Sequence, residues 1–436
     1  MRLGEGTGGS AFSRTRRPRD SAKGKERLVT AQSSDAQMPL AGLRVIELAD
    51  WVAGPFASSL LGDFGAEVIK IDRPGHVDYS RGLAGGSATD PGRTPSFAVS
   101  GRNKKSVTLD IRTEAGRLLF LRLIETSDVL IEAFRPGTLE RWGLGWDILK
   151  ASNNALTLLR ISGFGQDGPW RERPGVDRVG QAFSGVTYLT GYPDSPPVRC
   201  GLSFVDYATG LWGAFGVVLA LYERQRSGYG EGQVIDHALY ESVLPMLGDI
   251  PLNYRRSGRV AERTGNEIAG TAPGGLYLTS DEKYVQVSVS GTIAFARLAT
   301  AMDRPDLVSV RETALSDGSD DGMAPVVQAV ADWIRGLTAA DVESRLGTSG
   351  VTVSRVQSIA DLMDHPQVVA RGNFEELVDP SFGSLSACAV TPRLSRTPGR
   401  IRSPGPAPGA DNEEIYQGML AMSEQEMAIL RDENVI

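Results

Sequence analysis

The chain has 436 residues, of which 41% are hydrophobic and 23% charged, and its formal net charge is −7. This length and composition exclude a disordered chain and favour two domains or one enlarged α/β unit. Two cysteines and three histidines, without HxH or HxxxH spacing, exclude a disulfide framework and a histidine-built metal centre. No stretch approaches the roughly 18 uninterrupted apolar residues of a membrane span, so we expect no membrane partner.

Residues 1–37 differ from the rest of the chain in charge. They carry eight Lys/Arg and four Asp/Glu, a net charge of +4, which subtracted from −7 leaves −11 for residues 38–436. Such an acidic body argues against a nucleic-acid partner. The segment has neither hydrophobic periodicity nor an apolar signal region. We therefore expect a disordered extension ahead of a start at Met38, and a cytoplasmic protein.

From Leu43 onward, short apolar runs alternate with helical patterns. Strands are predicted at 43–48, 66–71, 106–110, 128–132 and 156–161, and helices at 56–63 and 113–126, the second with Thr113 as N-cap. This alternation predicts an α/β fold with a Rossmann-like, doubly wound parallel sheet. No GxGxxG follows the first strand and no GxxxxGK[ST] occurs, so a nicotinamide or flavin dinucleotide is not supported.

A long apolar helix is predicted over 207–226. It contains Gly210, Gly213 and Gly216 at three-residue spacing. Glycine inside a helix costs about 1 kcal/mol relative to alanine, so these three residues imply a second backbone packed very close. Another helix is expected at 234–247.

The pattern predicts four parts after the extension. A large Rossmann-like domain occupies 38–228, linker helices occupy 229–261, and a small α+β domain occupies 262–370. The small domain contains a strand at 283–290 and helices near 291–303, 323–336 and 338–346. The proline-rich remainder, 371–436, is expected to return to the large domain as an extended strap.

Three loop segments are candidate binding sites. The turn 50–55 lies at the carboxyl end of the first strand, where open α/β sheets bind ligands. Arg73 follows the next strand and suits a phosphate or carboxylate. The loop after strand 128–132 combines aromatic and guanidinium groups that suit an adenine ring and phosphates, namely Phe134, Arg135, Arg141 and Trp142. Each segment also has a purely structural interpretation as a turn, a surface arginine or loop packing.

Asp206 begins the long apolar helix, and the next charged side chain is Glu223. Ser203-Phe-Val-Asp206 fits a capping box, in which the carboxylate only satisfies the helix end. The alternative is a nucleophile whose carboxylate the helix dipole holds ionised and oriented. The residues alone leave both interpretations open.

An ordered series of motifs resembles the class III coenzyme A transferases. It runs through Leu40-Ala-Gly-Leu-Arg-Val-Ile-Glu-Leu, Leu61-Gly-Asp-Phe-Gly-Ala-Glu-Val-Ile-Lys-Ile, Asn103-Lys-Lys-Ser-Val and Ser227-Gly-Tyr-Gly-Glu-Gly-Gln. This family includes formyl-CoA and carnitine CoA-transferases, and its superfamily includes α-methylacyl-CoA racemases. The resemblance implies an interlocked homodimer, each chain with a Rossmann-like CoA-binding domain and a smaller domain. It also implies acyl-CoA and carboxylic acid substrates, without a metal or a tightly bound cofactor.

The resemblance also implies roles for individual residues. Asp206 matches the nucleophile, which forms an aspartyl anhydride with the acyl group and then an aspartyl-CoA thioester. Gly274 and Gly275 match part of a longer glycine loop that closes over these intermediates. The positions implied to contact the coenzyme are Val52, Arg73, Ala133, Phe134, Arg141 and Trp142. Val52 stands where formyl-CoA transferases have glutamine, and Ala133 replaces an asparagine of some relatives.

An acyl-CoA racemase is the main alternative. Such an enzyme needs two acid/base groups on opposite faces of the substrate carbon. The racemase histidine corresponds to Val176 here, and its glutamate to a position near Gly291, so neither group is present. A non-catalytic acyl-CoA-binding protein is a further alternative, which a buried Asp206 pointing away from the cleft would favour.

Overall fold

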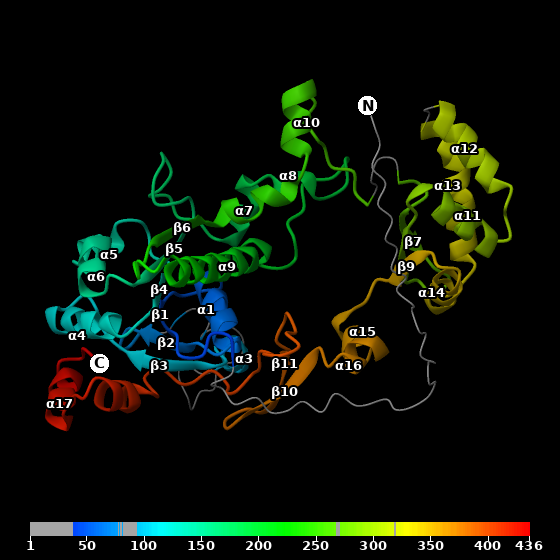
Figure 1. Cartoon of the computed structure of the whole chain (residues 1–436). Coiled ribbons are helices and arrows are strands. Elements are labelled where there is room, and N and C mark those ends of the chain that lie inside the picture. Colours follow the sequence, from blue (N-terminus) through cyan, green and yellow to red (C-terminus); the bar gives the residue numbers. More distant parts are fainter. Residues whose placement is uncertain (1–37, 77, 79–80, 82–93, 267–270, 318–319) are drawn as a thin grey trace, which may run out of the picture.

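The computed structural model describes residues 38–76, 78, 81, 94–266, 271–317 and 320–436 (Figure 1). The predicted extension at 1–37 lies outside the described residues. A six-stranded sheet forms the centre of one part of the molecule. Its strands are β1 (Arg44–Leu48), β2 (Glu67–Asp72), β3 (Lys104–Thr108), β4 (Val129–Glu132), β5 (Thr157–Ser162) and β6 (Val234–Ala238).

All neighbouring strands of this sheet pair in parallel, in the order β3-β2-β1-β4-β5-β6. The order reverses beside β1, which is the arrangement of doubly wound nucleotide-binding folds. The predicted parallel α/β sheet is therefore confirmed. Ligands of such sheets bind beyond the carboxyl ends of the strands at this reversal, here next to β1 and β4.

Helices cover both faces of the sheet. Ile46 of β1 belongs to a hydrophobic layer with α4 (Glu114–Glu125), whereas Val45 faces α1 (Ala53–Asp63) and α9 (Phe204–Ser227). This alternation follows from the two-residue period of a strand, and burial on both faces explains why the strands are continuous apolar runs. Shorter helices complete this part: α3 (Pro95–Ser100), α5 (Thr138–Arg141), α6 (Trp146–Ser152), α7 (Asp177–Phe183) and α8 (Val186–Leu189).

Helix α9 packs closely on α1. A Cβ atom added at Gly210 would lie 2.7 Å from the carbonyl oxygen of Ala53, and one added at Gly213 would lie 2.9 Å from a methyl carbon of Leu159. A Cβ at Gly216 would make only an ordinary contact, 3.4 Å from Ile235. The close backbone approach predicted from these glycines is confirmed at Gly210, whereas Gly213 meets a side chain and Gly216 is not crowded.

The helix predicted at 234–247, inside the expected linker helices, is wrong. Residues Val234–Ala238 form β6, which pairs with β5, and two 3₁₀ turns follow at Leu239–Ser242 and Leu244–Leu247 before α10 (Ile250–Ser257). The hydrogen bonds that the edge of β5 offers outweigh a helical periodicity that spans few residues.

A second sheet lies apart from the first, on the right of Figure 1. It is antiparallel, in the order β7 (Gly275–Leu278), β8 (Tyr284–Ser288) and β9 (Thr352–Arg355). Its own hydrophobic cluster contains Val287 and Phe295. The strand and three helices predicted here are confirmed, and a fourth helix joins them. The helices are α11 (Gly291–Ala301), α12 (Leu307–Asp317), α13 (Asp320–Arg335) and α14 (Ala339–Thr348).

The last part of the chain runs from α15 and α16, on the side of the second sheet, to β3 of the first sheet (Figure 1). It contains the helices α15 (Ile359–Met363) and α16 (Pro366–Ala370), the hairpin of β10 (Phe374–Asp379) and β11 (Gly383–Cys388), a π-helix (Glu413–Met419) and α17 (Glu424–Asp432). The carboxylate of Asp411 accepts a 2.7 Å hydrogen bond from Ser106 N, and the Tyr416 hydroxyl donates to Thr108 O at 2.8 Å. These contacts attach residues after 400 to the edge of the sheet.

Candidate active site

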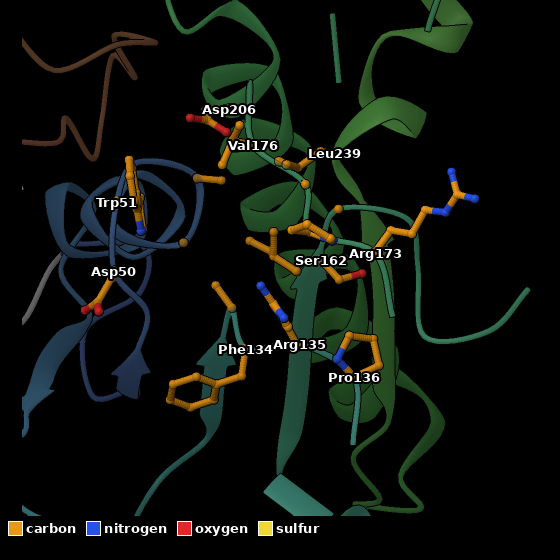
Figure 2. A pocket seen from close by; sticks show the side chains of 17 residues that line it. Asp50, Trp51, Phe134, Arg135, Pro136, Ser162, Arg173, Val176, Asp206 and Leu239 are labelled. Atoms are coloured by element: carbon orange, nitrogen blue, oxygen red, sulfur yellow. The ribbon is translucent and has the colours of Figure 1, made fainter. Parts of the chain in front are cut away.

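Asp206 lies in the first turn of α9, at the boundary between two cavities. The first cavity, of about 280 Å³, lies beyond the carboxyl ends of β1 and β4 (Figure 2). The second cavity, of about 480 Å³, lies between the 51–52 turn, the start of α7 and the loop before α9. Trp51, Val176 and Asp206 line both cavities. A molecule bonded to Asp206 therefore has space on either side of it.

Asp177, the first residue of α7, holds the start of α9. One oxygen of its buried carboxylate accepts hydrogen bonds from Val205 N at 2.8 Å and Asp206 N at 3.3 Å. The other oxygen accepts from Nε2 of Gln181 at 2.7 Å. Ser203, the N-cap residue, makes no side-chain capping hydrogen bond. The capping-box interpretation of Asp206 is therefore wrong, because Asp177 satisfies the helix end instead.

The carboxyl group of Asp206 is only partly exposed. Its burial, together with the nearby charge of Asp177, raises the pKa of Asp206 to about 7. Loss of hydration thus opposes the ionising effect expected from the helix dipole. The protonated and ionised forms of Asp206 therefore coexist near neutral pH.

The loop after β4 places an aromatic ring and a guanidinium at the first cavity. Phe134 and Arg135 line it, and Phe134 N donates to the buried carboxylate of Glu132 at 2.7 Å. Arg160 from β5 donates to the other oxygen of Glu132 at 2.7 Å. Trp142 packs edge-on against Phe134, with ring centroids 5.1 Å apart. These contacts fix the ring of Phe134 beside the open space.

Buried charged residues stabilise the Asp50–Val52 turn through hydrogen bonds to its backbone. Trp51 has a positive φ of 69°, which is unusual for a bulky residue. Its N–H donates to Asp78 at 3.3 Å, and Nζ of Lys70 donates to the carbonyl oxygen of Ala49 at 2.8 Å. The turn that borders Asp206 is therefore anchored to a fully buried lysine and a fully buried aspartate.

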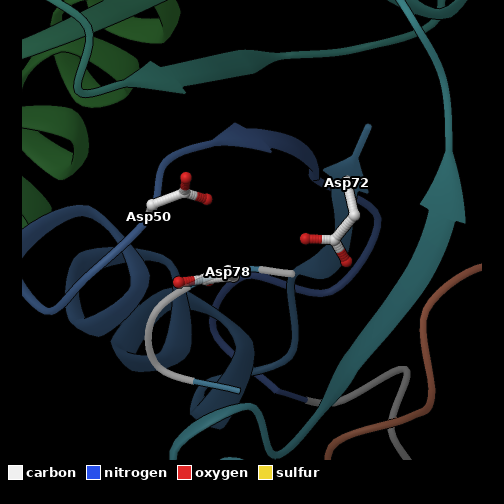
Figure 3. A group of neighbouring side chains, drawn as sticks. All are labelled: Asp50, Asp72 and Asp78. Carbon is white, nitrogen blue, oxygen red and sulfur yellow. The ribbon is translucent and has the colours of Figure 1, made fainter. Parts of the chain in front are cut away.

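Three carboxylates in this region approach one another closely enough to suggest a cation site (Figure 3). They belong to Asp50, Asp72 and Asp78, and their oxygens lie within 4.8 Å of one another. The ammonium group of Lys70 lies 2.9 Å from Asp78 and 3.6 Å from Asp72. Lys70 thus supplies the positive charge that these carboxylates require. We therefore interpret the group as an ion-pair network and not as a metal centre.

Comparison with known proteins identifies the family. A family model described as CoA-transferase family III matches residues 40–412. The chain belongs to CoA-transferase family III. It is 42% identical over 409 residues to the beta subunit of succinyl-CoA–L-malate CoA-transferase from Chloroflexus aurantiacus, covering 92% of this chain and 98% of the relative. The predicted family is confirmed, and the chain is a class III CoA-transferase.

Further relatives of this CoA-transferase cover its length to a similar extent. Succinyl-CoA–D-citramalate CoA-transferase from Chloroflexus aurantiacus is 39% identical over 398 residues, covering 91% of this chain and 98% of the relative. The crystal structure of a CAIB/BAIF family protein from Brucella suis is 31% identical and superposes with a TM-score of 0.75, covering 87% of this chain and 99% of that protein. The fold of this transferase is therefore that of its family.

The structure brings some of the predicted site residues of the CoA-transferase together and leaves others outside. Val52 lines the second cavity, and Ala133 and Phe134 line the first. Five predicted residues line neither cavity: Arg73, Arg141, Trp142, Gly274 and Gly275. Arg73 is exposed directly after β2. Gly275 begins β7, in the second sheet.

Sequence reasoning missed Asp177 and the two arginines of the second cavity. Asp177 and Gln181 stand four residues apart and therefore on one helix face, which was the available signal. Arg178 and Arg199 carried no such signal, since the cavity assembles them from separate segments. Val176, where racemases have histidine, borders both cavities and provides no acid or base.

Proposed function

We propose that this class III CoA-transferase moves coenzyme A from an acyl-CoA thioester to a small dicarboxylic acid, with Asp206 as the covalent nucleophile. The position of Asp206 between two cavities is the observation that carries this proposal. The relatives of this chain support a dicarboxylic acid as the acceptor, since their names pair succinyl-CoA or succinate with L-malate, D-citramalate or glutarate.

The proposed reaction has four balanced steps at one carboxylate. An oxygen of Asp206 attacks the thioester carbonyl. The carbon–sulfur bond breaks, CoA thiolate is released, and a mixed anhydride of Asp206 and the acyl group remains. The thiolate then attacks the aspartyl carbonyl, which releases the donor acid and forms an aspartyl-CoA thioester. The acceptor carboxylate attacks this thioester and expels the thiolate, giving a second anhydride. Attack of the thiolate on the acceptor carbonyl yields the new acyl-CoA and regenerates Asp206.

The first cavity suits the coenzyme side of the substrate. Phe134 offers a fixed aromatic face and Arg135 a guanidinium, and both stand within the same space as Asp206 (Figure 2). An aromatic ring beside a cation matches the adenine and phosphate groups of coenzyme A. In this proposal the thiol end of the coenzyme reaches Asp206 from the first cavity, and the acyl group extends beyond it.

We also propose that two copies of the chain interlock as a homodimer. Helix α9 exposes a continuous apolar face, formed by Tyr207, Leu211, Trp212, Phe215, Val218, Leu219 and Tyr222. By length and composition alone α9 could cross a membrane, and 44% of its most apolar stretch is buried within the protein. Two relatives are named as the alpha and beta subunits of one enzyme, so chains of this family assemble in that enzyme. In this proposal a second copy of the chain covers the apolar face of α9.

The covalent mechanism is tested by trapping. The full chain is incubated with succinyl-CoA, treated with hydroxylamine and analysed by peptide mass spectrometry. We expect a hydroxamate at Asp206 and no CoA transfer in Asp206→Asn, because the amide keeps the shape and loses the nucleophile. Asp194→Asn, an exposed aspartate that lines neither cavity, is the matched control. Wild-type turnover in Asp206→Asn would overturn the proposal.

A further inference from the structure

We propose that the second cavity beside Asp206 binds the distal carboxylate of the dicarboxylic acid, through Arg178 and Arg199. This inference rests on the proposed CoA transfer. It names the residues of the same site that determine which carboxylic acid is accepted. The two arginines line the cavity together with Val52, Leu202 and the nucleophile.

The position of the cavity fits an acid that is bonded to Asp206 by one end. Asp206, Trp51 and Val176 are shared with the first cavity, so the two spaces meet at the nucleophile. With the coenzyme in the first cavity, the acyl chain of a thioester or anhydride at Asp206 extends into the second. Its volume of about 480 Å³ is in the range of small-molecule sites.

The charges of the cavity favour an anion. Within the described part of the chain, neither Arg178 nor Arg199 forms an ion pair, whereas Arg160 in the sheet is paired with Glu132 and Glu140. One N–H of Arg199 donates to the carbonyl oxygen of Cys200 at 2.8 Å. A guanidinium has five N–H groups, so most of its donors are available.

The carboxylate of Asp177 does not neutralise these arginines. Its oxygens accept from Val205 N, Asp206 N and Gln181, and the group is buried. Arg178, the next residue, is exposed on the cavity side of the same helix start. Guanidinium groups bind carboxylates through paired, charge-assisted hydrogen bonds. An acid with a second carboxylate therefore finds two cations where a monocarboxylic acid places a methyl group.

Part of the wall of the second cavity is apolar. Val52 and Val176 lie there beside Asp206, and Leu202 lies on the loop before α9. Such a wall suits the methylene groups of a short diacid, whose polar atoms are confined to its two ends. The arrangement of nucleophile, apolar wall and cations matches the chemistry of a short aliphatic diacid.

A competition assay tests this assignment with the full-length chain. Succinyl-CoA is supplied as the donor with equal concentrations of glutarate and pentanoate, two acids with the same number of carbons. Both acceptors compete for the same enzyme-bound CoA, so the initial ratio of glutaryl-CoA to pentanoyl-CoA does not depend on the donor step. We expect wild type to favour glutarate by more than about tenfold, the scale of a charge-assisted hydrogen bond.

The variants Arg178→Gln and Arg199→Gln should each lower this ratio about tenfold, and the double variant should bring it near one. Arg178→Lys and Arg199→Lys keep the charge and should give intermediate ratios, which separates recognition from misfolding. Arg171→Gln, an exposed arginine that lines neither cavity, should leave the ratio unchanged.

Four results would overturn the inference in distinguishable ways. Equal use of both acids by wild type would show that the cavity does not recognise a second carboxylate, although the proposed CoA transfer would still be supported. An unchanged ratio in the double variant would assign the preference to other residues, and a uniform rise of KM for acyl-CoA would indicate that the arginines bind the coenzyme. Absence of both products and of an Asp206 adduct would overturn the proposed function, and this assignment with it.

Discussion

Asp177 accepts a hydrogen bond from the backbone N–H of Asp206 at 3.3 Å, while its negative charge raises the pKa of the Asp206 carboxyl. The same side chain therefore orients the nucleophile and disfavours its ionised form. The orienting effect depends on an acceptor oxygen, whereas the electrostatic effect depends on charge. Substitution of Asp177 by asparagine separates the two effects, because the amide keeps an acceptor oxygen and loses the charge.

We expect Asp177→Asn to retain CoA transfer and to shift the acidic limb of the rate profile to lower pH, because the pKa of Asp206 falls. Asp177→Ala should lose the cap of α9, at a cost of roughly 1–2 kcal/mol in the free energy of unfolding, together with most activity. The measurements are kcat/KM against pH and denaturant unfolding. An identical pH profile for Asp177→Asn and wild type would contradict the electrostatic effect.

The pKa of Asp206 predicts opposite pH trends for activity and stability. Activity should rise through about pH 7, because only the ionised carboxylate attacks. The raised pKa means that the folded state resists ionisation, so stability is fully present below the unfolded pKa, near 3.8, and is lost as pH rises through about 7. Asp206→Asn should therefore match wild type near pH 4 and unfold several degrees higher at pH 8, in thermal unfolding across this range. Equal melting temperatures at pH 8 would contradict the shift.

Local signals predicted most of the central sheet. Val129–Glu132 is a short apolar run that is fully buried, as continuous strands of parallel sheets are, and Thr113 caps α4 by accepting from Gly116 N at 3.0 Å. β6 was predicted as a helix because its pairing partner, β5, lies about 75 residues earlier in the sequence. Local periodicity does not contain that information.

The candidate site was predictable only in part for the same reason. Asp206 was noticeable as an isolated acid in an apolar helix, and Phe134 as an aromatic ring beyond a strand end. The cap from Asp177 joins residues 28 and 29 positions apart, and the second cavity joins the 51–52 turn to segments near 177 and 200. Such contacts depend on the tertiary structure, which is why Arg178 and Arg199 were missed.

The contact of α9 with α1 predicts opposite effects for two Gly→Ala variants. A Cβ at position 210 meets the backbone of Ala53 at 2.7 Å, so Gly210→Ala should destabilise the protein by roughly 1–3 kcal/mol. Gly216→Ala, on the same helix, meets only ordinary contacts and should be neutral or stabilising by up to about 1 kcal/mol. Urea unfolding of both variants checks the pair, and equal destabilisation would contradict the packing.

The buried ion-pair network below the Asp50–Val52 turn predicts a strong dependence on Lys70. Its ammonium lies 3.2 Å from Glu47 and 2.9 Å from Asp78, and all three side chains are fully buried. Lys70→Met should leave carboxylates buried without their counter-charge and cost roughly 3–5 kcal/mol in the free energy of unfolding. The loss should be smaller at low pH, where the carboxylates are protonated.

A matched control for Lys70 is Lys105, whose ammonium pairs with Glu67 and Glu414 at a partly exposed position. Surface pairs contribute about 0–1 kcal/mol, so Lys105→Met should change stability little. The network also holds the turn that carries Trp51, since Lys70 donates to Ala49 O and Asp78 accepts from Trp51 N. Folded Lys70→Met should therefore show a raised KM for acyl-CoA, and unchanged kinetics would contradict this positioning role.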